Sequence, residues 1–309
     1  MELVIILLLA LAIDLALGDP PTAIHPVGWM GRVIAFLIKR GKGRTPRFQL
    51  VYGIAVVLFT LALFVIPVYF GLAYLHDFNQ ILYVVAAALI LKTSFTLKGL
   101  RQAALKVKGL LAGNDSPAAR FEIRALVGRD TSKLNTRQLV SATIESIAEN
   151  SCDSFTAPLF YFLFLGVPGA IGYRVINTLD AMIGHHGEYE YLGKVAAKLD
   201  TAANYIPARI TAIAIVLASW LWKLKTASAW QIMLRDHNNT ESPNAGWTMA
   251  AIAGALQVQL EKVGYYKLGD SLNQLSLETI DLALKVVLTG AALWGLVVIL
   301  AEVIYRAAT

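Results

Sequence analysis

LVYGIAVVLFTLALFVIPVYFGLAYL, residues 50–75, contains no charged side chain and decides the class of fold. An α-helix needs about 20 apolar residues to cross the hydrocarbon core of a bilayer, and this run is longer than that. Three further runs are long and mostly apolar, although each includes at least one charged residue: 81 to about 97, 206–222 and 280–304. The chain therefore contains several candidate membrane-spanning helices.

Two weaker apolar runs add to this set. Residues 3–17 are few for a span and include Asp14, but they lack the basic start and the small-x-small cleavage site of a signal peptide. We expect this segment to be retained. Residues 155–176 are interrupted by Gly166, Pro168 and Gly169. A re-entrant helical hairpin over 155–184 is one explanation, because irregular backbone is tolerated at membrane depth where protein surrounds it.

The composition agrees with a membrane protein. Of 309 residues, 57% are hydrophobic and only 16% are charged, whereas about a quarter are charged in soluble domains. Strand patterns are scarce, and neither an internal repeat nor a low-complexity linker is visible. The sequence predicts an all-α, polytopic transmembrane bundle of about five or six membrane segments. We expect one integral-membrane domain over 1–309, with polar extramembrane segments at about 98–153 and 223–278.

The net charge of +6 reflects basic residues that gather in loops. Residues 31–50 contain six Lys and Arg side chains and no acid, which places this loop in the cytoplasm and the N-terminus outside. No nucleic-acid partner is expected, because nothing aromatic or repetitive accompanies the basic loop. The single cysteine, Cys152, excludes an intramolecular disulfide framework and a cysteine-rich metal site.

An acidic segment near the middle of the chain is the most informative motif. Glu145, Glu149 and Asp153 are spaced four residues apart, so a continuing helix from about Thr136 would stack three carboxylates on one face. Like charges at this spacing destabilise an isolated helix, whereas a divalent cation such as magnesium would hold them together. The alternative is a solvated acidic face. The apolar run that begins at Phe155 favours the functional interpretation.

A second motif lies inside an apolar stretch. Arg174, Asn177 and Asp180 recur at every third residue, and ionisable groups at membrane depth usually face a bundle interior or a cavity. A buried Arg–Asp pair that only joins helices is the alternative. The following His185 and His186 are adjacent, so they point in different directions on a helix and make a poor metal pair.

Two loops complete the candidate site. Ser242, Asn244 and Gly246 precede a helix of small residues, whose free N–H groups and positive dipole end suit an anionic oxygen, although an ordinary helix cap explains them equally well. Near the N-terminus, two prolines fix an extended loop that holds Asp19 and His25, either for a ligand or as a simple connector. Further candidates for the same space are Asp200, Asn204 and Arg209.

At these segments the sequence resembles the adenosylcobinamide-phosphate synthase family, the membrane amide ligases of cobalamin biosynthesis. The matching stretches are Leu17–Pro21 with His25–Val27, Glu145–Ser146 with Ala148–Asn150, Asp153 with Ala157–Phe160, Asn177–Asp180 with Met182–Gly184, and Ser242–Gly246 with Met249–Ala251. They spread over roughly residues 10–270. Ser154 stands where the family pattern has Gly, Ala181 where it has Ser, and His185-His186 where it has an aromatic residue and Lys, which affects only details of substrate contact.

The resemblance implies a reaction, its co-substrates and its place in the cell. Adenosylcobyric acid, (R)-1-amino-2-propanol phosphate or a related amino alcohol, and ATP with Mg²⁺ would give adenosylcobinamide phosphate. The expected setting is the cell membrane, with the active site on the cytoplasmic side. Other membrane enzymes of cobalamin biosynthesis are further expected partners.

The same resemblance assigns roles to residues. Glu145, Glu149 and Asp153 would hold Mg²⁺ and carry catalysis, with Glu149 or Asp153 as the general base. The remaining residues would bind substrate: Asp19, His25, Lys92, Asn150, Arg174, Asn177, Asp180, Ser242, Asn244 and Gly246. Among these, Arg174, Lys92 and the N–H groups near Asn244 and Gly246 would stabilise phosphate oxygens.

Two other classes of protein fit part of the sequence. A transporter of an anionic or corrinoid ligand would explain broken helices and intramembrane charges, but the polar segments are large and no half of the chain is repeated. A non-catalytic membrane scaffold for corrinoid enzymes is the other alternative. Replacement of Glu149 distinguishes an enzyme from a scaffold, because it should abolish turnover in an enzyme and leave a scaffold intact.

Overall fold

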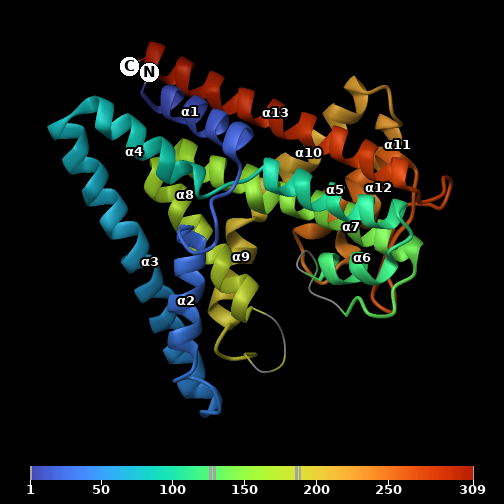
Figure 1. The fold of residues 1–309 in the computed structure, drawn as a ribbon, viewed down its shortest axis with the longest axis horizontal. Coiled ribbons are helices and arrows are strands. Elements are labelled where there is room, and N and C mark those ends of the chain that lie inside the picture. The colour runs from blue at the N-terminus through green and yellow to red at the C-terminus, as the bar shows by residue number, and fades with distance from the viewer. Residues whose placement is uncertain (1, 125–126, 128–129, 185–186, 188, 309) are drawn as a thin grey trace. The chain divides into compact units, whose positions relative to one another are not determined.

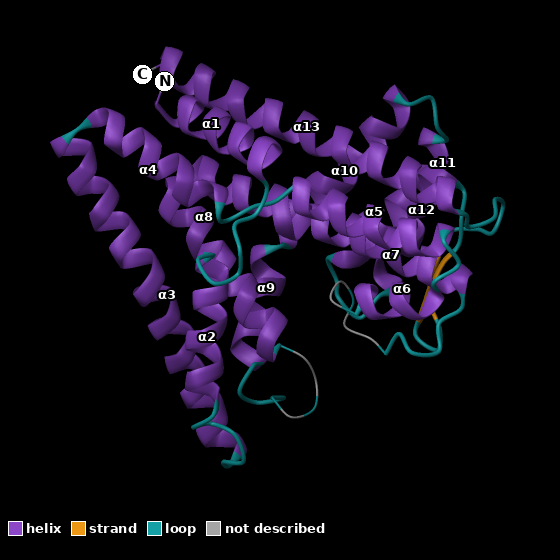
Figure 2. Ribbon diagram, in the orientation of Figure 1, coloured by secondary structure: helices purple, strands orange, loops and turns teal. Residues whose placement is uncertain are grey.

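The regular structure of the chain is almost entirely helical (Figures 1 and 2). The computed structural model describes residues 2–124, 127, 130–184, 187 and 189–308. Within these residues, strand structure is limited to β1 (Leu260–Lys262) and β2 (Tyr266–Leu268), which pair antiparallel. The predicted all-α class is therefore confirmed.

The chain divides into two compact units, each assembled from separate stretches of sequence. The first consists of residues 1–96, 157–204 and 298–309, and the second of residues 97–156 and 205–297. Helix α13 (Leu277–Ala308) contributes residues to both. The expectation of one integral-membrane domain stays a prediction.

Six helices and the end of α13 build the first unit. They are α1 (Glu2–Leu17), α2 (Pro26–Ile38), α3 (Pro46–Phe78), α4 (Gln80–Lys92), α8 (Ala157–Ile183) and α9 (Lys194–Ala203). Helix α1 packs against α4, and α8 contacts α2, α3 and α9 (Figure 1). Polar caps start several of these helices: the side chains of His25, Thr45 and Asn79 accept backbone N–H groups at the beginnings of α2, α3 and α4.

The predicted interruption of the apolar run near 166–169 is present. Gly166 has φ +64° inside α8, a backbone conformation that favours glycine, and Pro168 follows it. The helix therefore consists of two halves that meet at a kink. A re-entrant hairpin over 155–184 stays a prediction.

The loop before α9 packs unusually closely on its neighbours. A Cβ atom added at Gly193 would overlap the carbonyl oxygen of Ile183, and one added at Gly53 would overlap the carbonyl oxygen of Leu192. Both positions require glycine because a neighbouring carbonyl oxygen occupies the space that a side chain would need. These contacts fix the loop against α3 and α8.

The second unit has its own hydrophobic core. Its helices are α5 (Lys98–Ala112), α6 (Ser116–Ile123), α7 (Thr136–Ser151), α10 (Tyr205–Leu221), α11 (Thr226–Asp236) and α12 (Ala245–Leu256), with a π-helical turn at Cys152–Thr156 and a 3₁₀ turn at His237–Asn239. Helix α12 is buried on nearly every face and contacts α7, α10 and α11. Its small side chains allow this close approach, so it forms the centre of the unit.

The acidic helix begins where the sequence predicts but does not continue regularly. A capping box between Asn135 and Gln138 starts α7 at Thr136. After Ser151 the chain forms the π-helical turn, which alters the α-helical spacing before Asp153. That the three carboxylates share one face of the helix stays a prediction.

Long apolar helices agree with the membrane-protein class that the composition predicts. In the described part of the chain, residues 46–78, 136–183 and 277–305 are long and apolar enough to cross a membrane. The pair α9 and α10, bent by 45° at its break, adds a fourth candidate as a broken span or re-entrant loop. Helices α1 and α4 are shorter than a full span, with 16 and 13 residues. The predicted count of five or six segments is thus not confirmed.

Candidate functional site

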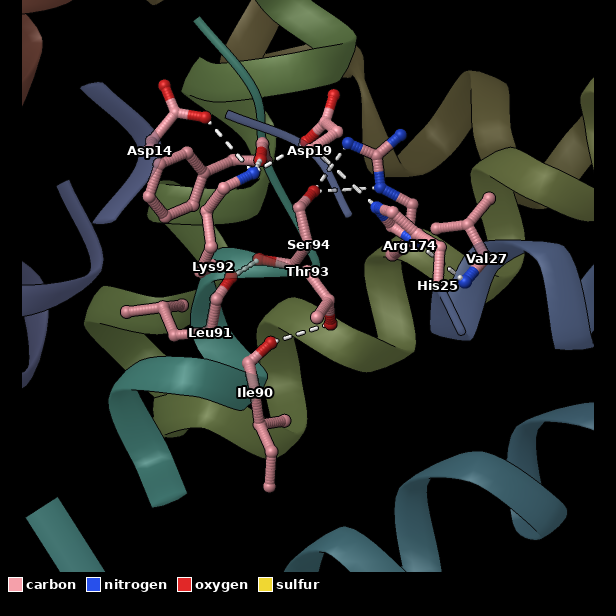
Figure 3. Close-up of polar contacts among 11 residues, drawn as sticks. Asp14, Asp19, His25, Val27, Ile90, Leu91, Lys92, Thr93, Ser94 and Arg174 are labelled. Atoms are coloured by element: carbon pink, nitrogen blue, oxygen red, sulfur yellow. Dashed lines mark hydrogen bonds and ion pairs between the residues drawn. The ribbon is translucent and has the colours of Figure 1, made fainter. Parts of the chain in front are cut away.

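The first unit contains a cavity of about 370 Å³ whose polar lining comes from three separate segments. The loop between α1 and α2, the turn after α4 and helix α8 contribute to it (Figure 3). Its polar side chains belong to Asp19, Thr22, His25, Thr93, Thr96 and Arg174. We call this space the Asp19–Arg174 cavity. Its lining includes the acidic side chain of Asp19 and the basic side chain of Arg174, so it suits a small charged molecule.

Lys92 lies behind one wall of this cavity, between two carboxylates (Figure 3). Its Nζ is 3.0 Å from Oδ1 of Asp14 and 2.5 Å from Oδ1 of Asp19, and it also donates to the carbonyl oxygen of Phe95 at 3.3 Å. Lys92 is only 3% exposed and Asp14 is fully buried, whereas Asp19 is 35% exposed. Buried charges persist only where they are paired and hydrogen-bonded, and this group meets that condition.

Arg174 of α8 holds the turn that follows α4. Its Nε donates to the carbonyl oxygen of Ser94 at 2.8 Å, and its second terminal nitrogen contacts the same oxygen. The other terminal nitrogen donates to Oδ1 of Asn177 at 3.2 Å. The turn itself is closed by the hydroxyls of Thr93 and Ser94, which donate to carbonyl oxygens at the end of α4. The guanidinium therefore reaches the cavity in a fixed orientation.

His25 caps α2 and faces Asp19. Its Nδ1 accepts the N–H of Val27 at 3.1 Å, and its Nε2 lies 4.0 Å from Oδ1 of Asp19. Burial lowers the pKa of His25 below its ordinary value; Asp19 raises it, and the nearby charges of Lys92 and Arg174 lower it further. In the neutral ring the proton then sits on Nε2, because Nδ1 is the acceptor. His25 is thus a hydrogen-bond donor toward the cavity.

A polar network continues from Arg174 away from the cavity lining. Asn177 donates to one oxygen of Asp200 at 3.4 Å, and Asn204 donates to the other at 3.0 Å. Tyr173 in turn donates to Asn204 at 2.8 Å. Asp200 and Asn204 thus contact the Arg174 segment, but neither they nor Arg209 are among the residues that line the cavity.

Asp180, the third member of the predicted motif, lies elsewhere. Its carboxylate packs against the backbone at Gly184, where a side chain at that glycine would overlap it. It does not line the Asp19–Arg174 cavity. His185 and His186 lie outside the residues that the structure describes.

In the second unit, Glu145 is engaged by the β-hairpin. The hydroxyl of Ser141 donates to Oε1 of Glu145 at 2.6 Å, and that of Tyr266 donates to Oε2 at 2.9 Å. Ser141 also accepts the N–H of Glu261 from β1 at 2.9 Å. Glu145 is only 4% exposed, so its carboxylate serves to attach the hairpin to α7.

The other members of the acidic segment are half-buried. Glu149 and Asp153 both retain partial exposure, and Asn150 donates to the backbone and hydroxyl oxygens of Ser146, within its own helix. Among the residues described, no group of three or more His, Cys, Asp and Glu side chains is arranged to hold a metal ion. The predicted Mg²⁺ site at the three carboxylates stays a prediction.

The segment before α12 shows capping and close packing. The hydroxyl of Ser242 accepts the N–H groups of Asn244 and Ala245, at 3.4 and 3.3 Å. Gly246 needs its small size because a Cβ there would overlap the carbonyl oxygen of His237. These observations favour the helix-cap alternative. The side chain of Asn244 accepts from Arg209 at 3.3 Å.

The structure thus assembles some of the predicted residues and divides others between the two units. Asp19, His25 and Arg174 line one cavity, with Lys92 directly behind it. Sequence reasoning missed the threonines of the lining and the role of Asp14. Asp14 offered a recognisable pattern, since it is a lone acid in an apolar run, and such residues usually have a partner. The threonines carried no comparable pattern.

The long apolar helices indicate a helical membrane protein. Its cavity is small and has acidic and basic side chains in its lining, so it suits a small ionic molecule. The model of the CobD/Cbib protein family matches residues 7–303, and this chain belongs to that family. Cobalamin biosynthesis is therefore its context.

Relatives from other organisms match this chain over most of its length. The cobalamin biosynthesis protein CobD of Dehalococcoides mccartyi is 51% identical over 96% of both chains. The probable cobalamin biosynthesis protein CobD of Methanothermobacter thermautotrophicus is 42% identical, covering 92% of this chain and 93% of its own. That of Methanocaldococcus jannaschii is 38% identical over 86% and 88%. No solved structure is significantly similar to this chain.

Proposed function

We propose that this protein is an adenosylcobinamide-phosphate synthase, which joins adenosylcobyric acid to (R)-1-amino-2-propanol phosphate, or a related amino-alcohol phosphate, in an ATP-dependent reaction. The family and its relatives support a role in cobalamin biosynthesis. The long apolar helices support a place in the cell membrane. The active site is proposed to face the cytoplasm, because the basic loop at 31–50 favours that side.

The observation that carries the proposal is the Asp19–Arg174 cavity. Arg174 supplies a fixed positive charge, and His25, Thr93 and Thr96 supply hydrogen-bond donors suited to phosphate oxygens. At about 370 Å³ the cavity lies at the small end of ligand pockets, which span roughly 300–1,000 Å³. Such a space suits a small phosphate ester far better than a corrinoid ring.

The reaction needs an activated carboxylate and a free amine. Transfer of the γ-phosphoryl group of ATP to the corrinoid carboxylate would give ADP and a mixed anhydride. The nitrogen of the amino alcohol then forms the amide bond as phosphate leaves, and the ammonium group gives up two of its three protons. Glu149 or Asp153, both half-buried in the second unit, is the proposed proton acceptor. His25 is unsuited to this role because its unprotonated nitrogen already accepts a backbone N–H.

Magnesium fits this chain only as a partner of the nucleotide. The carboxylate of Glu145 accepts hydrogen bonds from Ser141 and Tyr266, and Glu149 and Asp153 are the carboxylates of the acidic segment that we propose for the cation. Mg²⁺ is typically held by one or two carboxylates together with substrate phosphates, so two acids are sufficient. When bound, the ion would neutralise phosphate charge during transfer.

The test is a reconstituted reaction followed by mass. Protein purified in detergent is incubated with adenosylcobyric acid, aminopropanol phosphate, ATP and Mg²⁺. We expect a corrinoid with the mass of the amide, absent after EDTA treatment and in Glu149→Gln. If folded wild-type protein yields no amide with any of several amino-alcohol phosphates, the synthase proposal is wrong and a transporter or scaffold becomes the better explanation.

A further inference from the structure

The loop that joins α2 to α3 in the first unit carries a cluster of positive charge that the proposed reaction does not use (Figure 1). Four basic side chains in and beside this loop are exposed: Lys39, Arg40, Arg44 and Arg47. In the described part of the chain none of the four forms an ion pair with an acid, and residues 31–50 contain no acidic side chain. We call them the Arg40–Arg47 cluster. Positive charge without a nearby acid favours an anionic partner.

The loop is held in a defined shape. The hydroxyl of Tyr52 donates to the carbonyl oxygen of Leu37 at 2.9 Å, and the side chain of Gln49 donates to the carbonyl oxygen of Arg44 at 2.9 Å. Gly43 has φ +72°, a backbone conformation that favours glycine. The cluster therefore presents its charges from a fixed backbone.

Two exposed phenylalanine rings accompany the arginines. The guanidinium carbon of Arg40 lies 5.2 Å from the centre of the Phe36 ring, and that of Arg44 lies 6.0 Å from the centre of the Phe48 ring. The two rings, one on α2 and one on α3, are 59% and 46% exposed. Exposed apolar surface next to exposed cations matches the boundary between the hydrocarbon and the headgroups of a bilayer.

Helix α3 fixes the depth of the cluster. It begins at Pro46, within the cluster, and is long and apolar enough to cross a membrane. Few of its 33 residues are buried: Gly53, Val56, Val57, Thr60 and Leu72. Most of its apolar surface is therefore available to lipid chains. Its other end carries His76 and Asp77 and no Lys or Arg, so the cluster lies at headgroup depth on one side of the membrane only.

We propose that the Arg40–Arg47 cluster binds the headgroup of an anionic phospholipid, with the arginines at the phosphate and the rings of Phe36 and Phe48 at the start of the acyl chains. Guanidinium groups suit this ligand because they can donate two N–H groups to the oxygens of one phosphate. None of these residues lines the Asp19–Arg174 cavity, so the lipid site is separate and does not rest on the proposed function.

Native mass spectrometry of the full chain in detergent measures the binding. Protein is titrated with phosphatidylglycerol, which is anionic, or with phosphatidylcholine, which is not, in the absence of ATP and corrinoid. We expect wild-type protein to prefer phosphatidylglycerol. The triple variant Arg40→Gln/Arg44→Gln/Arg47→Gln should lose most of this preference, since each basic side chain near anionic lipid contributes roughly fivefold in affinity, or about a hundredfold for three.

Two controls separate a local site from net charge and from damage to the fold. Lys133→Gln/Arg137→Gln/Lys267→Gln removes three exposed positive charges from the second unit and should keep the wild-type preference. Replacement of the three arginines by lysine keeps the charge and should restore most of the preference. An unchanged preference in the glutamine variant of the cluster would overturn the lipid site and favour an acidic protein partner. An equal loss in the second-unit control would also overturn it, because only net charge would then matter.

The same phosphate chemistry occurs in soluble esters, and a competitor distinguishes the two sources. Glycerol phosphate carries the charged group without acyl chains, so at equal concentration it should not displace phosphatidylglycerol. Displacement would assign the cluster to a soluble phosphate ester and overturn the assignment to lipid. Because the assay contains no substrate of the proposed synthase, failure of the synthase proposal would leave the lipid site standing.

Discussion

The bond between Tyr266 and Glu145 offers a test of whether Glu145 is a structural residue or a metal ligand. Tyr266→Phe removes a hydroxyl that donates to the buried carboxylate at 2.9 Å, while the 2.6 Å bond from Ser141 remains. A hydrogen bond to a charged group contributes about 1.5–3 kcal/mol. The hairpin should therefore open more easily by about that amount, while the bond from the Glu261 N–H to Ser141 still attaches it to α7.

Hydrogen exchange followed by mass spectrometry measures this opening. The Glu261 N–H, which donates to Ser141, is the reporter, and its exchange should become roughly tenfold to a hundredfold faster in Tyr266→Phe. Glu145→Gln should accelerate exchange as well, and the double variant should show less than the sum of the two effects because the residues share one bond.

Activity provides the decisive comparison with the acidic segment. Glu145→Gln should keep amide synthesis at a temperature where it remains folded, whereas Glu149→Gln should lose it. The reasoning fails if Glu145→Gln is inactive while exchange at Glu261 stays at the wild-type rate. That result would restore Glu145 to the set of metal ligands.

Three further predictions concern the first unit. Burial lowers the pKa of His25 below its ordinary value of 6.5, so the stability that its cap provides is complete above pH 6.5 and is lost as the pH falls through the lowered pKa. Between pH 7.5 and pH 5 the melting temperature of wild-type protein should therefore fall more than that of His25→Asn, because asparagine caps the helix without titrating. A similar slope in both proteins would contradict this. Arg174→Lys keeps the charge but cannot reproduce the two-nitrogen contact with Ser94, so the affinity for isopropyl phosphate measured by calorimetry should drop at least about tenfold; an unchanged affinity would show that charge alone suffices. Gly193→Ala places a methyl group where it overlaps a backbone carbonyl oxygen of α8, so it should lower the free energy of unfolding by about 1–3 kcal/mol or more. Gly71→Ala, which has open space around it, should not destabilise the protein. Equal melting temperatures of the two variants would refute the close packing at Gly193.

The sequence alone was sufficient for the class of the protein. Charge-free runs such as 50–75 indicate membrane helices because the bilayer accepts little else, and the structure has a long apolar helix there. The start of the acidic helix near Thr136 was also predicted correctly, and Asn135 caps the helix there. These features depend on neighbouring residues, so one chain suffices to recognise them.

The chemistry of individual side chains was less predictable. Glu145 and Glu149 look equivalent in the sequence, four residues apart on one helix, yet only tertiary structure shows that Tyr266, from 121 residues away, donates to Glu145. Likewise, the π-helical turn after Ser151 was not predicted from the sequence.

The same distinction applies to the cavity. The sequence marked Asp19, His25 and Arg174 as candidates because polar residues beside or within apolar segments need partners, but it could not say which partners they have. Folding brings Lys92 to Asp19 across 73 residues and Arg174 to Ser94 across 80. A residue's charge is local, whereas its partner, its burial and therefore its role are set by contacts between distant segments, which only the tertiary structure determines.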